Sequence, residues 1–360
     1  MKIPACALVA AILAVAFGAP AAPPGVVKNV VVCKESGRFA GWPANNGLWA
    51  WGDEIVVGFI QGAFKNHKFG HAIDEDKPMT VLFARSLDGG ETWRVEASTL
   101  SNAEPEECPG GIDFTAPDFV MALRMVNSAE GYSRFYCSTD RCHTWSGPCK
   151  LPAFDRKTVS ARTDYLVLGK NDLIAFMTAA KDNGREGRPF CTRTTDGGKT
   201  WEFVSWIAPE PAGFAIMPST VRLGPDSFLT AIRRQEHQSG FLDLYRSDDT
   251  GKTWQFLSKA VETTGGNPPA MIKLKDGRIA LTYGYREEPC GLRAKISTDD
   301  GKTWGDEIIL RQDGGCWDLG YPRIMQRPDG KLVNVYYYND APDQERYIAA
   351  TIWDPGAVGG

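Results

Sequence analysis

Hydrophobic and polar positions along the chain form short apolar runs that are separated by turn residues. In the clearest case, apolar residues 270–274 and 279–283 flank an Asp-Gly dipeptide at 276–277, and the same arrangement recurs around 329–330. Two apolar or β-branched runs on either side of Asp-Gly predict a β-hairpin. No segment shows a sustained helical period. The pattern therefore predicts an all-β protein.

An eight-residue segment repeats along this chain of hairpins. Its pattern is Ser/Thr-x-Asp-x-Gly-x-Thr-Trp, and Cys142 is the one residue that breaks the glycine position. The Asp can accept hydrogen bonds from its own turn, the Gly allows a positive φ, and the Trp supplies an apolar plug for a neighbouring sheet. Successive copies are 50 to 56 residues apart, a spacing typical of propeller blades. The five copies are residues 86–93, 138–145, 194–201, 247–254 and 297–304.

This repeat resembles the Asp-box, or bacterial neuraminidase repeat, of the sialidase superfamily. The resemblance covers most of the chain and implies a β-propeller with its boxes at the periphery, away from the active site. Five boxes account for five blades, and residues 321–353 supply strands for a sixth. A short strand at residues 30–32 is then left to complete the last blade. We therefore expect a six-bladed β-propeller of four-stranded antiparallel blades, closed by the N-terminal strand so that no edge is exposed.

The resemblance to sialidases also implies a catalytic pattern. A sialidase uses a tyrosine nucleophile that a glutamate activates, and an aspartic acid/base near the first box. Tyr321, ahead of the last Asp-Gly hairpin, holds the place of the tyrosine. Asp74 and Asp76 both stand where the acid is expected. The Tyr321 phenol is thus the expected nucleophile or base.

A sialidase also clamps a carboxylate with three arginines. The second arginine is expected at Arg233 or Arg234, and the third at Arg286 or Arg293. Arg38 is the nearest arginine to the first position. These residues are the candidates for binding an acidic sugar.

Three positions depart from the sialidase pattern. Pro218 stands where the activating glutamate is expected, and Glu236 near Arg233 is a possible substitute. The first arginine is replaced by residues 42–45, and its glutamate partner by Tyr336. The last two losses belong together, because a missing arginine needs no carboxylate partner.

The expected central funnel contains further charged and aromatic residues. Flat aromatic rings bind sugar rings, and guanidinium groups bind acidic groups through paired hydrogen bonds. Glycoside hydrolysis needs an acid on one side of the bond and a base or nucleophile opposite, and Asp164 is an alternative to Tyr321 for the second role. The additional candidates for substrate binding are Arg162, Asp164, Trp317, Asp318 and Arg323.

The loop at residues 65–71 places His71 beside the candidate acids Asp74 and Asp76. One interpretation makes His71 a general acid or base. A second makes it a metal ligand together with the two aspartates, and a third is a polar loop that only packs. We expect no metal and no cofactor.

Length, composition and charge limit the possible partners. The 360 residues suggest two domains by length, but the repeat favours a single domain over residues 22–360. Apolar residues make up 43% and charged residues 23%, as in ordinary globular proteins. The net charge of −4 provides no basic face for nucleic acid. The expected partner is a carbohydrate, and no feature assigns an oligomeric state.

The N-terminus reads as a secretory signal peptide over residues 1–21. Lys2 is followed by apolar residues 5–17 and by a small-residue cleavage site at 19–21. The apolar stretch is too short to span a bilayer, and no later stretch replaces it. We therefore expect a protein that is exported to the periplasm or the extracellular space and has no membrane anchor.

Eight cysteines remain after residue 21, an even number that permits complete pairing in an oxidising compartment. Cys137, Cys142 and Cys149 crowd around the second box, which predicts one local disulfide bond. A zinc cluster is the alternative, but the chain has no Cys-x-x-Cys pair.

Three hypotheses for function follow. The first is a sialidase-like exo-glycoside hydrolase that releases a terminal acidic sugar from a glycan. The second is a polysaccharide lyase, in which an arginine neutralises a uronate carboxylate and Tyr321 or His71 takes the α-proton. The third is a glycan-binding propeller without catalysis, which Pro218 at the activating position favours.

Overall fold

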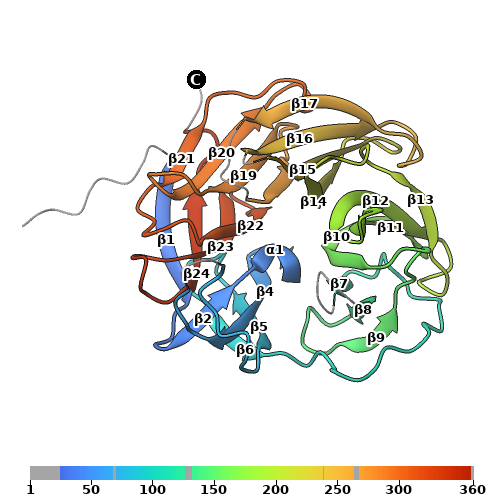
Figure 1. The fold of residues 1–360 in the computed structure, drawn as a ribbon, viewed down its shortest axis with the longest axis horizontal. Coiled ribbons are helices and arrows are strands. Elements are labelled where there is room, and N and C mark those ends of the chain that lie inside the picture. The colour runs from blue at the N-terminus through green and yellow to red at the C-terminus, as the bar shows by residue number, and fades with distance from the viewer. Residues whose placement is uncertain (1–24, 68–69, 126–131, 238, 263–266, 358–360) are drawn as a thin grey trace, which may run out of the picture.

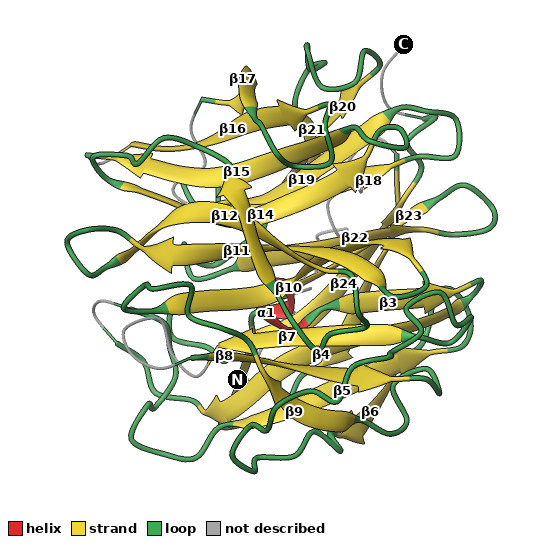
Figure 2. Cartoon of the chain, turned by 90° about the vertical axis from the view of Figure 1, so that its right-hand side faces the viewer, coloured by secondary structure: helices red, strands yellow, loops and turns green. Residues whose placement is uncertain are grey.

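Six β-sheets surround a central axis as the blades of a propeller (Figure 1), which confirms the predicted fold. The structure is a computed structural model and describes residues 25–357 except 68–69, 126–131, 238 and 263–266. The predicted signal peptide, residues 1–21, lies outside the described residues. Strands make up most of the described chain, and Figure 2 shows them from the side of the ring.

The blades are numbered in chain order, and their strands pair antiparallel with their neighbours. Blade 1 contains β2 (Arg38–Gly41), β3 (Leu48–Trp51), β4 (Glu54–Ala63), β5 (Thr80–Ser86) and β6 (Arg94–Ala97). Blade 2 contains β7 (Val120–Met125), β8 (Ser133–Ser138) and β9 (Ser146–Lys150). Blade 3 contains β10 (Val159–Gly169), β11 (Asp172–Ala180), β12 (Glu186–Thr194) and β13 (Glu202–Trp206).

The three blades of the second half of the ring each contain four strands, as blade 3 does. Blade 4 contains β14 (Phe214–Arg222), β15 (Phe228–Glu236), β16 (Ser239–Ser247) and β17 (Gln255–Val261). Blade 5 contains β18 (Pro269–Lys273), β19 (Ile279–Tyr285), β20 (Gly291–Ser297) and β21 (Ile308–Arg311). Blade 6 contains β22 (Gly320–Gln326), β23 (Leu332–Tyr338), β24 (Tyr347–Trp353) and β1 (Val26–Cys33).

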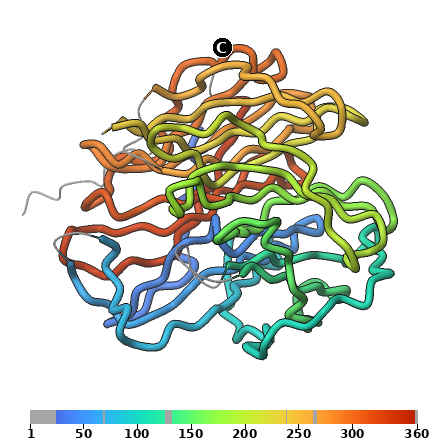
Figure 3. Tube along the Cα trace, turned by 45° about the vertical axis from the view of Figure 1, so that its right-hand side comes forward, coloured from blue at the N-terminus to red at the C-terminus, as the bar shows by residue number. Residues whose placement is uncertain are grey.

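The N-terminal strand β1 closes the ring, as predicted. It pairs antiparallel with β24, with Val30 opposite Ala350, and in Figure 3 the blue N-terminal part of the described chain lies against the red C-terminal part. Every residue of β23 and β24 is buried, because neighbouring strands and blades cover both. Closure therefore shields apolar strands that would otherwise form an open sheet edge.

The five boxes are the turns between the last two strands of blades 1 to 5. In the last box, Ser297 Oγ accepts from Gly301 N at 2.9 Å, and Asp299 accepts from Thr303 N at 2.9 Å and from Thr303 Oγ1 at 2.6 Å. The other four boxes make the corresponding bonds. Each turn is therefore held by its own side chains, which confirms the interpretation of the repeat.

Box residues also join neighbouring blades. Trp145 of blade 2 stacks on Phe83 of blade 1, with ring centroids 5.7 Å apart and planes 14° apart. Trp201 of blade 3 contacts Phe135 of blade 2 at 5.6 Å. An aromatic pair of this kind contributes about 0.5–1.5 kcal/mol beyond the area that it buries. The repeat therefore stabilises both its turn and the packing of its blade on the preceding one.

The inner edge of blade 1 is interrupted by the helix α1 (Pro43–Asn46). Strands β2 and β3 both pair with β4, and α1 lies between them at the centre of the ring (Figure 1). Pro43 suits the first position of a helix because its missing N–H would have no partner there. The preceding residue, Trp42, has a φ of 62°. Residues 42–46 thus occupy the axis of the propeller.

The eight cysteines of the described chain are all free thiols. The local disulfide bond predicted among Cys137, Cys142 and Cys149 is therefore absent from the described structure. Cys137 packs in the core between blades 2 and 3, and Cys142 packs in the core between blades 1 and 2, so their thiols face different blade interfaces. Cys149 packs against the same core as Cys137 and lies beside Cys108, and burial and Cys108 raise the pKa of the Cys149 thiol to about 12.

Within the described residues, no helix combines the length and the apolar character that a membrane span requires.

Candidate active site

Three inner strands carry a β-bulge, and two of the bulges hold the candidate residues Arg162, Asp164, Tyr321 and Arg323. The register shifts between Ala161 and Tyr165 in β10, between Ile216 and Ser219 in β14, and across residues 320–323 in β22. Bulges bend a strand and redirect its side chains, and they are common next to active sites. In two of them a non-glycine residue has a left-handed conformation, with φ 55° at Met217 and 51° at Tyr321. Strained backbone of this kind is concentrated at functional sites.

Tyr321 lies at the end of the blade 6 bulge and is 9% exposed. Its backbone N–H donates to Asn267 Oδ1 at 2.9 Å, which holds the strained residue in place. Its hydroxyl oxygen accepts from Arg233 Nη1 at 3.1 Å. The guanidinium of Arg286 lies 5.5 Å from the centre of its ring. The phenol is therefore surrounded by positive charge.

These arginines change the acidity of Tyr321. Burial raises the pKa of a phenol, but Arg233, Arg286 and Arg162 together outweigh burial and bring the pKa of Tyr321 below its ordinary value. A lower pKa makes the phenolate easier to form at neutral pH. Tyr321 is therefore equipped to act as a nucleophile or as a base.

The three arginines come from three different blades. Arg162 on β10 is held by Glu186, whose two oxygens accept at 2.5 and 3.1 Å, and it also donates to Asn45 Oδ1 at 3.2 Å. Arg233 on β15 has no carboxylate partner among the described residues. Guanidinium groups recognise carboxylates and sulfates by paired hydrogen bonds. The centre of the ring thus has a local excess of positive charge that suits an anionic ligand.

Arg286 follows β19 and is fixed by neighbours from the next blade. It donates to the Leu319 carbonyl oxygen at 3.2 and 3.3 Å and to Tyr337 Oη at 3.1 Å. Its guanidinium lies 5.3 Å from the ring centre of Trp317, which is 39% exposed. A flat exposed ring beside a cation is a suitable surface for a sugar.

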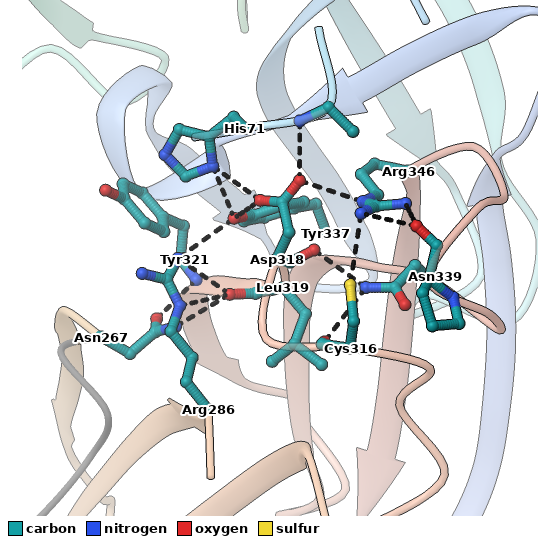
Figure 4. A network of polar contacts seen from close by, with 12 residues as sticks. His71, Asn267, Arg286, Cys316, Asp318, Leu319, Tyr321, Tyr337, Asn339 and Arg346 are labelled. Atoms are coloured by element: carbon teal, nitrogen blue, oxygen red, sulfur yellow. Dashed lines mark hydrogen bonds and ion pairs between the residues drawn. The ribbon is translucent and has the colours of Figure 1, made fainter. Parts of the chain in front are cut away.

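His71 and Asp318 form a hydrogen-bonded pair beside Tyr321 (Figure 4). His71 Nδ1 lies 2.6 Å from Asp318 Oδ1, and the imidazole ring lies edge-on to Tyr321, with centroids 6.0 Å apart. The side chain of His71 is 27% exposed, whereas that of Asp318 is 1% exposed. An imidazole that one carboxylate orients is a frequent general acid or base.

Asp318 itself is saturated by donors. Besides His71 it accepts from Tyr337 Oη at 2.8 Å, Ala72 N at 2.9 Å and Arg346 Nε at 3.0 Å. Burial raises the pKa of a carboxyl, but these bonds and charges hold the pKa of Asp318 far below its usual range. Asp318 therefore remains ionised and orients His71, and it is not accessible to a ligand.

Asp164 and Arg323 lie beneath the site and hold its frame. Asp164 is 8% exposed and accepts from Thr220 N at 3.3 Å and Thr220 Oγ1 at 3.0 Å. Burial raises its pKa to about 7, although Arg323 acts in the opposite direction. Arg323 donates to the carbonyl oxygens of Ala44 and Thr163 and so ties α1 to β10.

The structure does not bring Asp74 and Asp76 to Tyr321. Asp74 Oδ1 lies 3.1 Å from Lys65 Nζ, and Asp76 Oδ2 lies 3.6 Å from the same nitrogen. The side chain of Asp76 is 92% exposed. His71 bonds to Asp318 and not to either aspartate, and among the described residues no group of three His, Cys, Asp or Glu side chains is placed to hold a metal ion.

Arg234 and Glu236 face away from Tyr321. Adjacent residues of a strand point to opposite faces of the sheet, so Arg233 reaches the axis whereas Arg234 pairs with Asp243 at 3.2 Å and with Glu236. Glu236 is thus occupied by Arg234.

Arg293 and Arg38 also lie apart from Tyr321. Arg293 is 3% exposed and bonds to Glu307 and to the backbone of its own blade. Arg38 donates to Gln61 Oε1 at 3.3 Å within blade 1.

Several residues of this cluster have no signal in the sequence. Tyr337, Arg346 and Glu186 lie in the cluster because of contacts between blades or strands, and no local motif marks them. Tyr336 holds the place of a sialidase glutamate, but its hydroxyl bonds to Thr351 Oγ1 at 2.5 Å, and the adjacent Tyr337 reaches His71. Tyr336 and Tyr337 are adjacent on β23, opposite the bulge at residues 320–323, and adjacent residues of a strand point to opposite faces. This alternation is the signal that distinguishes the two tyrosines.

Comparisons with known proteins agree with this architecture. The family described as a BNR repeat-like domain matches residues 69–334. A search of curated proteins found no match. Among solved structures, a protein of unknown function from Dyadobacter fermentans is 23% identical, with a TM-score of 0.71, and the alignment covers 91% of this chain and 98% of that one.

Two glycan-acting enzymes share the fold at lower identity. An intramolecular trans-sialidase from Ruminococcus gnavus is 12% identical, with a TM-score of 0.60 and coverage of 88% of this chain and 95% of that one. An α-L-arabinofuranosidase from Fusarium graminearum is 12% identical, with a TM-score of 0.61 and coverage of 92% and 98%. These likenesses show the fold, and the chemistry has to be argued from the residues of this chain.

Proposed function

Since this chain belongs to the family of BNR repeat-like domains, and solved glycosidases share its fold, we propose that it is an exo-acting glycoside hydrolase that releases a terminal acidic sugar from a glycan. The observation that carries the proposal is Tyr321. Its phenol has a lowered pKa among three arginines and lies beside His71, which Asp318 orients.

In the proposed reaction the arginines Arg162, Arg233 and Arg286 bind the anionic group of the sugar, and Trp317 lies along its ring. The Tyr321 phenolate attacks the anomeric carbon and forms a covalent bond as the glycosidic C–O bond breaks. His71 gives a proton to the leaving oxygen. Water then attacks the same carbon, returns a proton to His71 and releases both Tyr321 and the sugar.

Lyase chemistry is a second candidate, because it needs an arginine beside a base and Arg233 lies 3.1 Å from the Tyr321 oxygen. Pro218 stands where a sialidase has its activating glutamate, so that the Tyr321 phenol depends on cations alone for activation. In a lyase, an arginine neutralises a uronate carboxylate, Tyr321 or His71 removes the proton next to it, and the bond to the leaving oxygen breaks as a double bond forms. That product absorbs in the near ultraviolet, whereas hydrolysis adds the elements of water and creates no double bond.

The test is a screen of sialosides and uronate-containing glycans, read by mass spectrometry and ultraviolet absorbance. We expect Tyr321→Phe to lower sugar release at least about 100-fold, because nucleophilic or acid–base groups contribute on this scale. Tyr132→Phe is the matched control, since Tyr132 is 40% exposed and bonds to Glu104 away from the site.

Activity of Tyr321→Phe within a few-fold of the parent would exclude the phenol as nucleophile or base. Binding of a glycan without release of any sugar by the parent would favour a non-catalytic glycan-binding propeller instead.

A further inference from the structure

A second pocket lies in the cleft between blades 1 and 2. Its volume is about 280 Å³, and its lining comes from β4 and β5, from the loop after β6, and from β7 and β8. The polar lining includes Thr80, Ser98 and Asn102, and the cationic lining consists of Arg124 and Arg134. We refer to it as the blade 1–2 pocket.

The two arginines of this pocket face each other without an acid between them. Arg124 on β7 is directly opposite Arg134 on β8 in the strand register. In the part of the chain that the structure describes, neither forms an ion pair: Arg124 donates to Asn46 Oδ1 at 2.8 Å, and Arg134 Nε has no hydrogen-bond partner. Like charges in directly opposite positions destabilise a pair of strands. A bound anion would offset this repulsion.

Burial of the two arginines increases their attraction for an anion. Burial lowers the pKa of Arg124 to about 10, and Arg134 acts in the same direction. Arg134 also lies over the ring of Tyr136, 6.0 Å from its centre. Two partly desolvated guanidinium groups attract an anion more strongly than exposed ones do.

The blade 1–2 pocket is connected to the central site. A smaller cavity of about 100 Å³ shares Ile60 and Arg124 with it and extends to Asn45 and Asn46 of α1. Asn45 in turn accepts a hydrogen bond from Arg162, one of the three central arginines. Hydrogen bonds of the neighbouring residues Asn45 and Asn46 thus link Arg162 of the central site to Arg124 of the blade 1–2 pocket.

We propose that the blade 1–2 pocket is a subsite for an anionic substituent, a sulfate ester or a carboxylate, on the sugar next to the one in the central site. This inference rests on the proposed function, because it assumes a glycan whose terminal sugar occupies the axis. Paired guanidinium groups match the oxygens of either anion, and the apolar lining, which includes Met79 and Leu100, covers the sugar ring.

The first experiment uses inorganic sulfate as the probe and measures its affinity by calorimetry. We expect Arg134→Gln to bind sulfate about tenfold more weakly than the parent, as the loss of one charge-assisted contact predicts. Arg222→Gln is the control, since Arg222 is exposed in blade 4 and bonds to the carbonyl oxygens of Gly224 and Pro225 in the adjacent turn. Sulfate also stabilises proteins non-specifically, and the difference between the two variants removes that effect.

Equal affinity of the parent and Arg134→Gln for sulfate would overturn the proposal. Arg134→Lys keeps the charge and should retain most of the affinity, which provides a second variant if Arg134→Gln folds poorly. Loss of sulfate binding in Arg233→Gln, with full binding in Arg134→Gln, would place the anion in the central site and would also overturn it.

A second experiment identifies the source of the anion. Oligosaccharides of equal length that carry a sulfate ester, a carboxylate or no charge next to the terminal sugar are compared for binding to the parent and to Arg134→Gln. We expect one of the anionic compounds to lose affinity in the variant and the neutral one to be unaffected. Because these experiments measure binding, their outcome is independent of whether the protein releases a sugar.

Discussion

At the scale of single residues, Asp318 organises the site although it does not face a ligand. Its two oxygens receive bonds from His71, Ala72, Tyr337 and Arg346. These partners belong to the loop after β4 and to the region of β23 and β24. One buried carboxylate thus fixes the orientation of His71 and joins the first blade to the last.

We expect Asp318→Asn to lower kcat by about 100-fold while KM changes only a few-fold, because an imidazole without its orienting carboxylate loses its acid–base function. The check is steady-state kinetics on the glycan that the parent cleaves, with thermal unfolding measured in parallel. Asp343→Asn, at an exposed loop position, serves as the control. A change in KM alone, or a full loss of folding, would contradict a positioning role.

At the scale of elements, the boxes show how a turn can be stabilised by its own polar groups. In the last box the bonds from Thr303 lower the pKa of Asp299 to about 2. A carboxyl with a lowered pKa in the folded state stabilises the fold above its unfolded pKa of about 4, and the contribution is lost as the pH falls towards 2.

We therefore expect Asp299→Asn to reduce the free energy of unfolding at pH 7 by about 1 kcal/mol, the scale of hydrogen bonds at a solvent-exposed turn. The difference from the parent should shrink as the pH is lowered from 5 to about 3. Denaturant unfolding across this range measures it, with Asp306→Asn, which is exposed, as control. A difference that does not vary with pH would show that the charge of Asp299 is not its source.

The inner strands show a different use of an element. β10, β14 and β22 each carry a bulge, and blade 1 replaces part of its inner strand with α1. These irregularities aim side chains from separate blades at one point on the axis. The outer strands and their boxes supply the frame that holds them.

At the scale of the whole molecule, closure of the ring couples the chain ends to the site. β1 covers β24, and β24 neighbours β23, which contributes Tyr337 to the cluster around Asp318. Removal of β1 would therefore expose the edge of a buried strand and loosen one wall of the site.

We expect a chain that begins at residue 35 to melt about 10 °C or more below a chain that begins at residue 25. Burial of Val32, Cys33 and their partners contributes several kcal/mol. Each kcal/mol corresponds to about 2–4 °C in a domain of about 150–250 residues. Differential scanning calorimetry measures the shift, and light scattering tests for association through the bared edge. Equal melting temperatures would show that closure is not important for stability.

The sequence by itself determined the architecture. Each box contains its own hydrogen-bonding partners and its own plug, so that the turn can be recognised in eight residues without knowledge of the rest. The five boxes then predict five blades, and the strands at residues 321–353 predict the sixth. The unpaired strand near the N-terminus predicts the closure. Such local information can be read from a single chain because it depends on neighbours in sequence.

Only the tertiary structure decided which candidate side chains meet. Arg233 and Arg234 are equivalent in the sequence, but strand alternation sends only Arg233 to Tyr321. Arg286 and Arg293 were separated by their places in blade 5, since Arg286 follows β19 and lies over the ring of Tyr321 whereas Arg293 lies on β20 and is buried within the blade. The position of a funnel side chain depends on bulges, on α1 and on contacts between blades that lie far apart in sequence, and no local pattern contains that information.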